Sequence, residues 1–428
     1  NRVTGLSPQP NDEWLVETEQ GNLTCEHVVN AAGCYANEVM KWVGSSAPIS
    51  NMEHQFLVTD TIPELLDFAG ELPVMRDPYT AGYYRQEQKS GLIGIYETGA
   101  KESWTHRGGF PAWESESELF EDDLERIAPW IEHAFERMPI LSNAGIKRVI
   151  NGAIPHSPDG NPLLGPAAGL RNFWMCCGSS IGIAQGAGCG KYLAQWMVHG
   201  DCEINVSGFD PRRFGKYADA DYTRAKSFQD YEHMFVTHLP GEERPAGRPA
   251  RRSGLYDVLC AKGAVHTEAF GWERPKWFSL DGRGEEGGFR RNDLHPVIAE
   301  ECRAVRERVG VLDLSSFAKF DVSGPNAAAF LNRIYGNAMP KRPGGIVLTH
   351  RLGRGGRIEG ESTITRLGDE HYYVLSGAAW ELLDLDQFEA MRQAGENVQV
   401  SNITDDFGVL VVAGPKARDT LSALTPED

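Results

Sequence analysis

The chain has 428 residues, of which 41% are hydrophobic and 10% aromatic, so it is too apolar to be disordered and long enough for more than one buried core. Its 60 Asp and Glu residues exceed its 42 Lys and Arg residues, which gives a net charge of -18. An acidic surface excludes non-specific binding to nucleic acid or to anionic membranes. The sequence also lacks the run of about 20 apolar residues that a membrane-spanning helix requires.

Strands and helices are expected to be mixed over the first two hundred residues, because period-two and helical apolar patterns alternate there. The predicted strands are 14–18, 27–30, 55–59, 82–86, 92–96, 149–153 and 173–177. The predicted helices are 34–43, 183–199, which Gly200 ends, and the acidic stretch 114–138, as one helix or a pair.

A Pro-, Gly- and Arg-rich segment at 240–252 predicts a linker or a long exposed connection. A helix predicted at 294–309 begins the next part, where short strands and helices alternate as far as Gly414. We therefore expect an α/β and α+β multidomain fold. The predicted domains are 1–200, 201–252 and 253–428.

The eight cysteines form no C-x-x-C motif, and no group of His and Cys residues has zinc-ligand spacing. This pattern predicts buried free thiols in a reducing compartment and no metal site.

Two stretches of glycine in the region 178–191 differ in what they predict. Residues 186–191 resemble a dinucleotide fingerprint, but Lys191 stands where the last glycine belongs, and the P-loop pattern also fails. Those glycines alone favour close packing of a helix on a sheet. The loop 178–183 lies between a predicted strand and a helix start, where free N–H groups and the positive helix end favour an anion or an electron-rich ring.

Several segments resemble, in the same order, the FAD-dependent amine-oxidising family of dimethylglycine and sarcosine dehydrogenases. The segments that resemble its flavin domain are 28–33, 52–59, 156–166 and 178–190. Those that resemble its junction and its folate domain, which is similar to the glycine-cleavage aminomethyltransferase, are 208–214, 254–259, 270–278, 311–317 and 412–418. The family's G-x-G-x-x-G motif, its flavin-linking histidine and the second half of its folate domain are not in these residues. We therefore expect the chain to be part of a longer protein, lacking both ends and not competent alone.

The resemblance implies two groups of FAD-binding residues. Those expected beside the adenosine and pyrophosphate are Val3, Asn30, Ala31, Ala32 and Gly33. Those expected around the isoalloxazine ring are Gly178, Ser179, Ser180, Ile181, Gly182 and Ile183. For 31–33 the alternative is an ordinary tight turn between a strand and a helix.

The resemblance also implies that His54 and Tyr83 are catalytic. Hydride loss from an amine requires a neutral nitrogen, since its lone pair forms the iminium, and a histidine can accept the ammonium proton. Tyr83 would orient that histidine or the substrate carboxylate. Arg85, which strand alternation places on the same face as Tyr83, is a candidate for binding the carboxylate. The alternatives are a structural histidine and a surface arginine.

In the C-terminal part, Glu361 matches the folate-site acid of the aminomethyltransferase family, where many members have Asp. A carboxylate there would hydrogen-bond the pterin and manage a proton as folate nitrogen attacks the iminium. The alternative is an exposed glutamate on a strand.

The function implied by the resemblance is oxidative N-demethylation of dimethylglycine or sarcosine, with FAD as oxidant and tetrahydrofolate as the one-carbon acceptor. An electron-transfer flavoprotein is a further expected partner. The expected compartment is the bacterial cytoplasm, or the mitochondrial matrix in a eukaryote. The alternative is a non-catalytic regulator with the same architecture, like the regulatory subunit of pyruvate dehydrogenase phosphatase. Oxidase or dehydrogenase activity, the preferred substrate and covalent attachment of FAD stay open.

Overall fold

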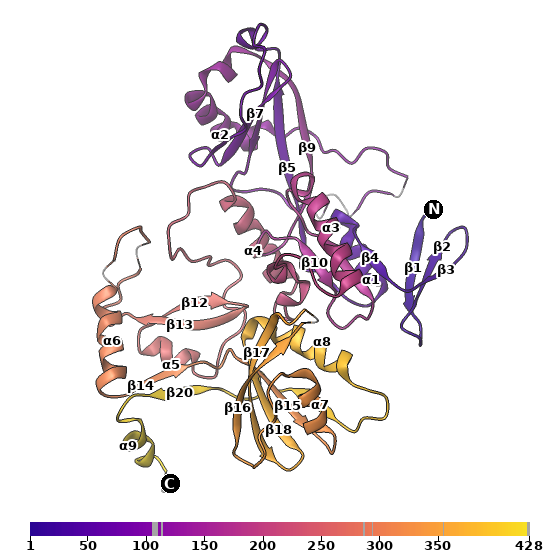
Figure 1. Ribbon diagram of the computed structural model, residues 1–428. Helices are drawn as coiled ribbons and strands as arrows, with labels where there is room; N and C mark the ends of the chain where they lie inside the picture. Colours follow the sequence, from indigo (N-terminus) through magenta and orange to yellow (C-terminus); the bar gives the residue numbers. More distant parts are fainter. Residues whose placement is uncertain (105–109, 113, 286, 293, 354, 426–428) are drawn as a thin grey trace.

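The computed structural model describes residues 1–104, 110–112, 114–285, 287–292, 294–353 and 355–425 (Figure 1). It contains mixed α/β and α+β parts, as predicted. Among the described helices, none combines the length and the apolar character needed to cross a membrane.

The first part of the chain contains a small parallel strand pair. Its elements are β1 (Val3–Pro8), β2 (Trp14–Thr18), β3 (Leu23–Cys25), β4 (Val28–Asn30), α1 (Ala36–Trp42), β10 (Leu163–Pro166), β11 (Phe173–Cys177) and α3 (Gly182–His199). The strands β1, β2 and β3 form one sheet, and β10, β11 and β4 form another, in which β4 and β11 are parallel. Because parallel strands end at the same edge of a sheet, the loops after β4 and β11 emerge side by side.

A third, five-stranded sheet has the strand order β6-β7-β8-β5-β9. Its strands are β5 (Ser50–Thr59), β6 (Met75–Asp77), β7 (Gly82–Glu87), β8 (Ser90–Ile95) and β9 (Ile146–His156), and its helices are α2 (Leu124–Arg137) and α4 (Ala220–His233). The helix α2 packs Ile127 and Ile131 against Leu57 and Ile93 of the sheet. Figure 1 shows α2 beside this sheet at the top of the view and α4 near the lower end of β5.

The predicted helix 114–138 is too long at its N-terminal end, because α2 begins only at Leu124. The preceding residues instead bond to the strands β5 and β9. The N–H of Phe120 donates to the carbonyl of Asn151, and the side chain of Gln55 donates to the carbonyl of Asp123. These long-range hydrogen bonds replace the helical ones that an acidic amphipathic pattern suggests.

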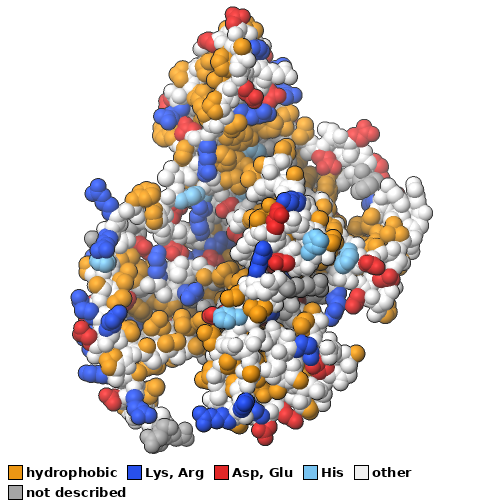
Figure 2. Space-filling view, viewed as in Figure 1, with side chains coloured by type: hydrophobic (Ala, Val, Ile, Leu, Met, Phe, Trp, Pro, Cys, Tyr) orange, Lys and Arg blue, Asp and Glu red, His pale blue; other side chains and the backbone are white. Residues whose placement is uncertain are grey.

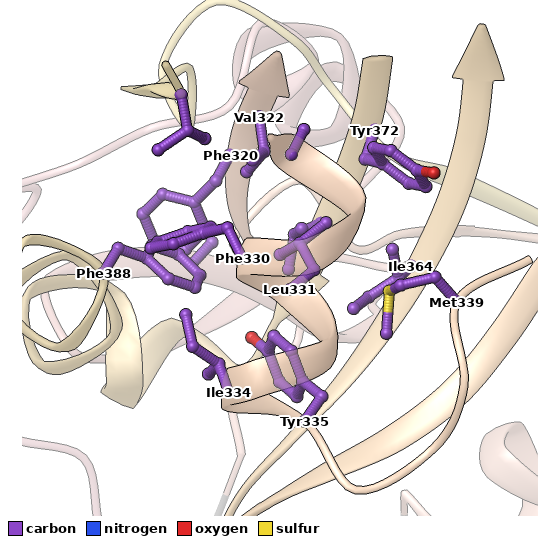
Figure 3. Packing of buried hydrophobic residues seen from close by; sticks show 14 residues of the cluster. Phe320, Val322, Phe330, Leu331, Ile334, Tyr335, Met339, Ile364, Tyr372 and Phe388 are labelled. Atoms are coloured by element: carbon purple, nitrogen blue, oxygen red, sulfur yellow. The ribbon is translucent and has the colours of Figure 1, made fainter. Parts of the chain in front are cut away.

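The C-terminal part is built around the sheet β16-β17-β18-β15-β19. Its elements are α5 (Tyr256–Ala261), β12 (Ala264–Ala269), β13 (Trp272–Phe278), α6 (His295–Glu307), β14 (Gly310–Asp313), β15 (Ala318–Ser323), α7 (Ala327–Ile334), β16 (Ile346–Leu352), β17 (Ile358–Gly368), β18 (His371–Ser376), α8 (Glu381–Met391), β19 (Gln399–Asn402), β20 (Leu410–Ala413) and α9 (Ala417–Ser422). The core lies under α7, where Phe330 and Leu331 meet Phe320 and Ile364 (Figure 3). In Figure 2, charged side chains are interspersed over the visible face, and hydrophobic ones lie on the upper lobe as well as low in the view.

The segment 240–252 contains no helix or strand, but it is not simply an exposed connection. Arg248 forms an ion pair with Glu273 at 2.6 Å. Arg251 forms ion pairs with Glu381 at 2.7 Å and with Asp405 at 2.8 Å. These contacts fix the segment against the C-terminal part.

The cysteines are free, but the prediction that they are buried is wrong for most of them. Cys177 and Cys202 are buried, whereas Cys260 and Cys302 are exposed. Cys260 lies on the short helix α5 and Cys302 lies on α6. Neither helix contains a buried residue.

We expect Lys319→Met to destabilise the C-terminal part. Lys319 is fully buried, and its Nζ donates to the carbonyls of Ser315, Phe317 and Thr404 at 2.8, 2.9 and 2.8 Å. Methionine leaves these carbonyls unpaired, so the free energy of unfolding should fall by about 3 kcal/mol or more in urea denaturation of the complete gene product. The exposed Lys341→Met should change it by less than about 0.5 kcal/mol, and equal effects would contradict this account.

Candidate active site

A cavity of about 890 Å³ lies where β4 ends. Val3, Asn30, Ala31 and Ala32, four of the predicted FAD-binding residues, line it. The lining is otherwise mainly apolar, with Tyr35 among the polar members. A cavity of this size can hold a substantial part of a large cofactor.

The turn after β4 is shaped by Asn30, which is buried. Its side-chain nitrogen donates to the carbonyl of Ala36 at 3.0 Å, and its side-chain oxygen accepts from the N–H of Ala32 at 3.2 Å. Gly33 has a φ of 55°, which favours glycine. Asn30 therefore holds the turn, while the small side chains of Ala31 and Ala32 face the cavity.

The loop 178–183 emerges at the same sheet edge, but its residues are not among those that line the cavity. Gly178 has a φ of 72°, and Ser179 donates to the side-chain oxygen of Gln185 at 2.7 Å. Ser180 Oγ is buried and has no hydrogen-bond partner among the described residues. Ile181, Gly182 and Ile183 at the start of α3 are exposed. The sheet thus brings both predicted FAD segments to one edge.

The expectation that the glycines of 186–191 provide close helix–sheet packing is wrong for the described residues. A Cβ added at Gly186, Gly188 or Gly190 would meet no atom within 4 Å. No described element packs closely against α3 at these three glycines.

His54 lies on β5 in an aromatic environment. Its Nε2 is 3.4 Å from the hydroxyl of Tyr83, and its Nδ1 is 3.0 Å from the hydroxyl of Tyr231 on α4. The rings of His54 and Tyr96 have centroids 4.5 Å apart. Burial lowers the pKa of His54 to about 3, and the charge of Arg126 acts in the same direction. His54 is therefore neutral at physiological pH.

A buried ion-pair cluster lies behind Tyr231. The Tyr231 hydroxyl donates to Glu97 Oε2 at 2.9 Å, and Glu97 Oε1 is 2.8 Å from Arg126 Nε. Arg126 also lies 3.6 Å from the carboxylate of Glu53. Burial raises the pKa of Glu97, while the guanidinium of Arg126 opposes the rise.

Strand alternation in β7 separates two adjacent tyrosines. Tyr84 is buried in the core under α2, whereas Tyr83 packs with the residues on the His54 side. Burial raises the pKa of Tyr83 to about 12, so it carries its proton. Arg85 is exposed and forms an ion pair with Glu87 at 2.5 Å. No contact between Arg85 and His54 is seen in the described structure.

Glu361 lies far from this cluster in sequence, on β17 of the C-terminal sheet. Its neighbour Ser362 points into the core, so Glu361 faces outward and its side chain is 62% exposed. The Nε2 atom of His350, directly opposite on β16, lies 3.1 Å from the carboxylate.

Sequence reasoning missed Tyr231, Glu97 and Arg126. They stand 177, 43 and 72 residues from His54, and no local motif links them. Glu97 gave a weak signal, since it comes two residues after the end of the apolar strand β8. An acidic group that is buried at such a position is expected to be paired.

Three family models match the chain in succession. Residues 1–196 match the FAD dependent oxidoreductase family, residues 199–253 its central domain, and residues 255–428 the GCVT N-terminal domain. The chain therefore belongs to the FAD-dependent oxidoreductases in which a flavin domain and a central domain precede a GCVT-type domain.

Three relatives match all or nearly all of the chain. Mouse mitochondrial dimethylglycine dehydrogenase is 41% identical over 100% of this chain and 50% of its own length. Mouse mitochondrial sarcosine dehydrogenase is 30% identical over 100% of this chain and 51% of its own length. The mouse regulatory subunit of pyruvate dehydrogenase phosphatase is 28% identical over 96% of this chain and 47% of its own length. The chain thus spans about half the length of these relatives.

The lowered pKa of His54 predicts a pH-dependent contribution to stability. Between pH 6.5 and about 3 the unfolded histidine binds a proton that the folded one does not, so stability falls as pH falls. From pH 7.5 to 5.0 the loss due to His54 should be about 2 kcal/mol. Urea denaturation of the complete gene product and of its His54→Gln variant at both pH values measures the difference. A variant with the same pH dependence as the wild type would contradict a buried neutral His54.

Proposed function

We propose that the protein containing this chain catalyses FAD-dependent oxidative N-demethylation of a small N-methylated amino acid and passes the one-carbon unit to tetrahydrofolate. The observation that carries the proposal is the 41% identity, over the whole chain, with a dimethylglycine dehydrogenase. The buried pair formed by His54 and Tyr83 supplies groups suited to that chemistry.

The residues at the sheet edge fit the demands of FAD. Val3, Ala31 and Ala32 offer small and apolar walls in a cavity of about 890 Å³, and Asn30 and Gly33 shape the turn beside it. The hydroxyl of Ser180, which has no hydrogen-bond partner in the described part of the chain, and the open start of α3 offer a donor and backbone N–H groups. When bound, FAD would accept a hydride from the carbon next to the substrate nitrogen.

His54 would receive the proton that leaves the substrate ammonium group. Its pKa of about 3 leaves the lone pair free but makes it a weak base in the absence of substrate. The carboxylate of a bound amino acid would bring negative charge nearby, which raises the pKa of a histidine. Arg85 would bind that carboxylate only by giving up its ion pair with Glu87.

Glu361 would act in the folate site, with His350 as its neighbour. Its exposure leaves it accessible to a ligand. A carboxylate in this position would hydrogen-bond the pterin and accept a proton as the folate nitrogen attacks the one-carbon unit.

The relatives differ in the substrates that their names give. Dimethylglycine is proposed first and sarcosine second, because the dimethylglycine dehydrogenase is 41% identical to this chain and the sarcosine dehydrogenase 30%. A 4-methylaminobutanoate oxidase from Paenarthrobacter nicotinovorans is 29% identical over 96% of this chain and 50% of its own length. An electron-transfer flavoprotein is the proposed oxidant of the bound flavin in a dehydrogenase. The proposed compartment is the cytoplasm of a bacterium or the mitochondrial matrix. The regulatory alternative rests on a more distant relative.

We expect the complete gene product to be yellow and its visible flavin band to bleach when dimethylglycine, or sarcosine, is added anaerobically. His54→Ala should slow the bleaching by about 100-fold, which is the typical contribution of a positioned base. The measurement is stopped-flow absorbance. A colourless wild-type protein would contradict the flavoenzyme and favour the regulatory alternative, and a yellow protein that bleaches with neither amine would contradict the proposed substrates.

We expect Glu361→Gln to leave flavin bleaching unchanged while more formaldehyde and less methylene-tetrahydrofolate are formed. The amide keeps the shape of the side chain but cannot accept a proton. Both products are quantified after turnover with tetrahydrofolate present. Glu370→Gln, an exposed change at the turn after β17, is the matched control and should alter neither product. Unchanged products in Glu361→Gln would rule out the proposed folate role.

A further inference from the structure

We propose that Tyr231 is a positioning residue that fixes the tautomer of His54, so that Nδ1 carries the hydrogen and Nε2 presents its lone pair toward Tyr83. This inference rests on the proposed function only for its catalytic consequence, because the tautomer itself is a property of the protein without substrate. The observations that carry it are the chain of contacts from His54 through Tyr231 and Glu97 to Arg126.

The direction of hydrogen bonding follows from counting protons. Glu97 faces Arg126 at 2.8 Å, and as a carboxylate it can only accept hydrogen bonds. Tyr231 has one hydroxyl proton and donates it to Glu97. Its oxygen can therefore only accept from His54 Nδ1, which lies 3.0 Å away. The Nδ1 atom must carry the hydrogen.

The other ring nitrogen is then defined. A neutral imidazole holds one N–H, so Nε2 has the lone pair, and the hydroxyl of Tyr83 at 3.4 Å donates to it. The groups that face His54 from neighbouring elements are Tyr96 after β8, Arg126 on α2 and His156 on β9. The Nε2 of His156 pairs with Asp230 at 2.7 Å. Both Arg126 and His156 disfavour the imidazolium form, which keeps the ring neutral in the absence of substrate.

The proposed consequence concerns where the substrate proton goes. A proton leaving an ammonium nitrogen would reach Nε2 directly or through the Tyr83 hydroxyl. The imidazolium formed would keep its Nδ1–H bond to Tyr231, so no ring rotation is needed. A histidine free to choose its tautomer would often present an N–H at Nε2, where it cannot accept a proton.

The test is nitrogen NMR of the complete gene product labelled with 15N-histidine, without amine, with His54→Gln used to assign the signals. We expect a protonated Nδ1 and an unprotonated Nε2 at His54. In Tyr231→Phe, which keeps the ring but removes the acceptor, the Nε2–H form should appear. A wild-type Nε2–H form, or a Tyr231→Phe protein that keeps only the Nδ1–H form, would overturn the proposal. If the variant fails to fold, the wild-type spectrum by itself tests the proposal.

A kinetic measurement distinguishes a positioning role of Tyr231 from a purely structural one. Tyr231→Phe should lower the limiting rate of flavin bleaching by about 10-fold or more with little change in KM for the amine. Tyr222→Phe is the matched control on the same helix, since its hydroxyl donates to Glu268 and not to His54. It should change neither the tautomer nor the limiting rate. If the wild type fails to bleach but shows the expected tautomer, the proposed function fails while the tautomer assignment stands.

Discussion

The pairing of β5 with β9 is the constraint on which the rest of the candidate active site depends. The ladder runs from Ser50 opposite His156 to Thr59 opposite Ile146, along the whole of β5. Because side chains alternate along a strand, this register fixes the face on which each residue lies. Leu57 packs under α2, whereas His54 points to Tyr231 on α4. A slip of one residue would exchange these faces and remove His54 from its partners.

Much of the architecture could be predicted because local sequence patterns determine it. The strand at 173–177 and the helix ended by Gly200 were predicted correctly, and Gly200 has the left-handed conformation expected at such an end. The family and the order of its parts were also predicted, from motifs spread along the chain. The segment 114–123 failed because its hydrogen-bond partners lie on β5 and β9, which a helical periodicity in one segment does not reveal.

The candidate site was predicted only in part, for the same physical reason. His54 and Tyr83 were chosen from family resemblance, and the structure brings their side chains together. The roles assigned to them stay predictions. Burial lowers the pKa of His54 most, and Arg126, whose charge acts in the same direction, meets Glu97 only when α2 packs against the sheet. No spacing in the sequence encodes the contact between Glu97 and Arg126, because it depends on tertiary packing and not on local periodicity.

The burial of this cluster has a chemical consequence for an amine oxidation. An iminium hydrolyses when water reaches it, so a site that excludes water protects the product of hydride loss. Exclusion of water also makes every charge costly, and His54 responds by staying neutral. The carboxylates Glu53 and Glu97 lie beside the guanidinium of Arg126 and pair with it. In the proposed mechanism His54 would take up a proton only when substrate brings it, so the dry site need not hold a permanent cation at His54.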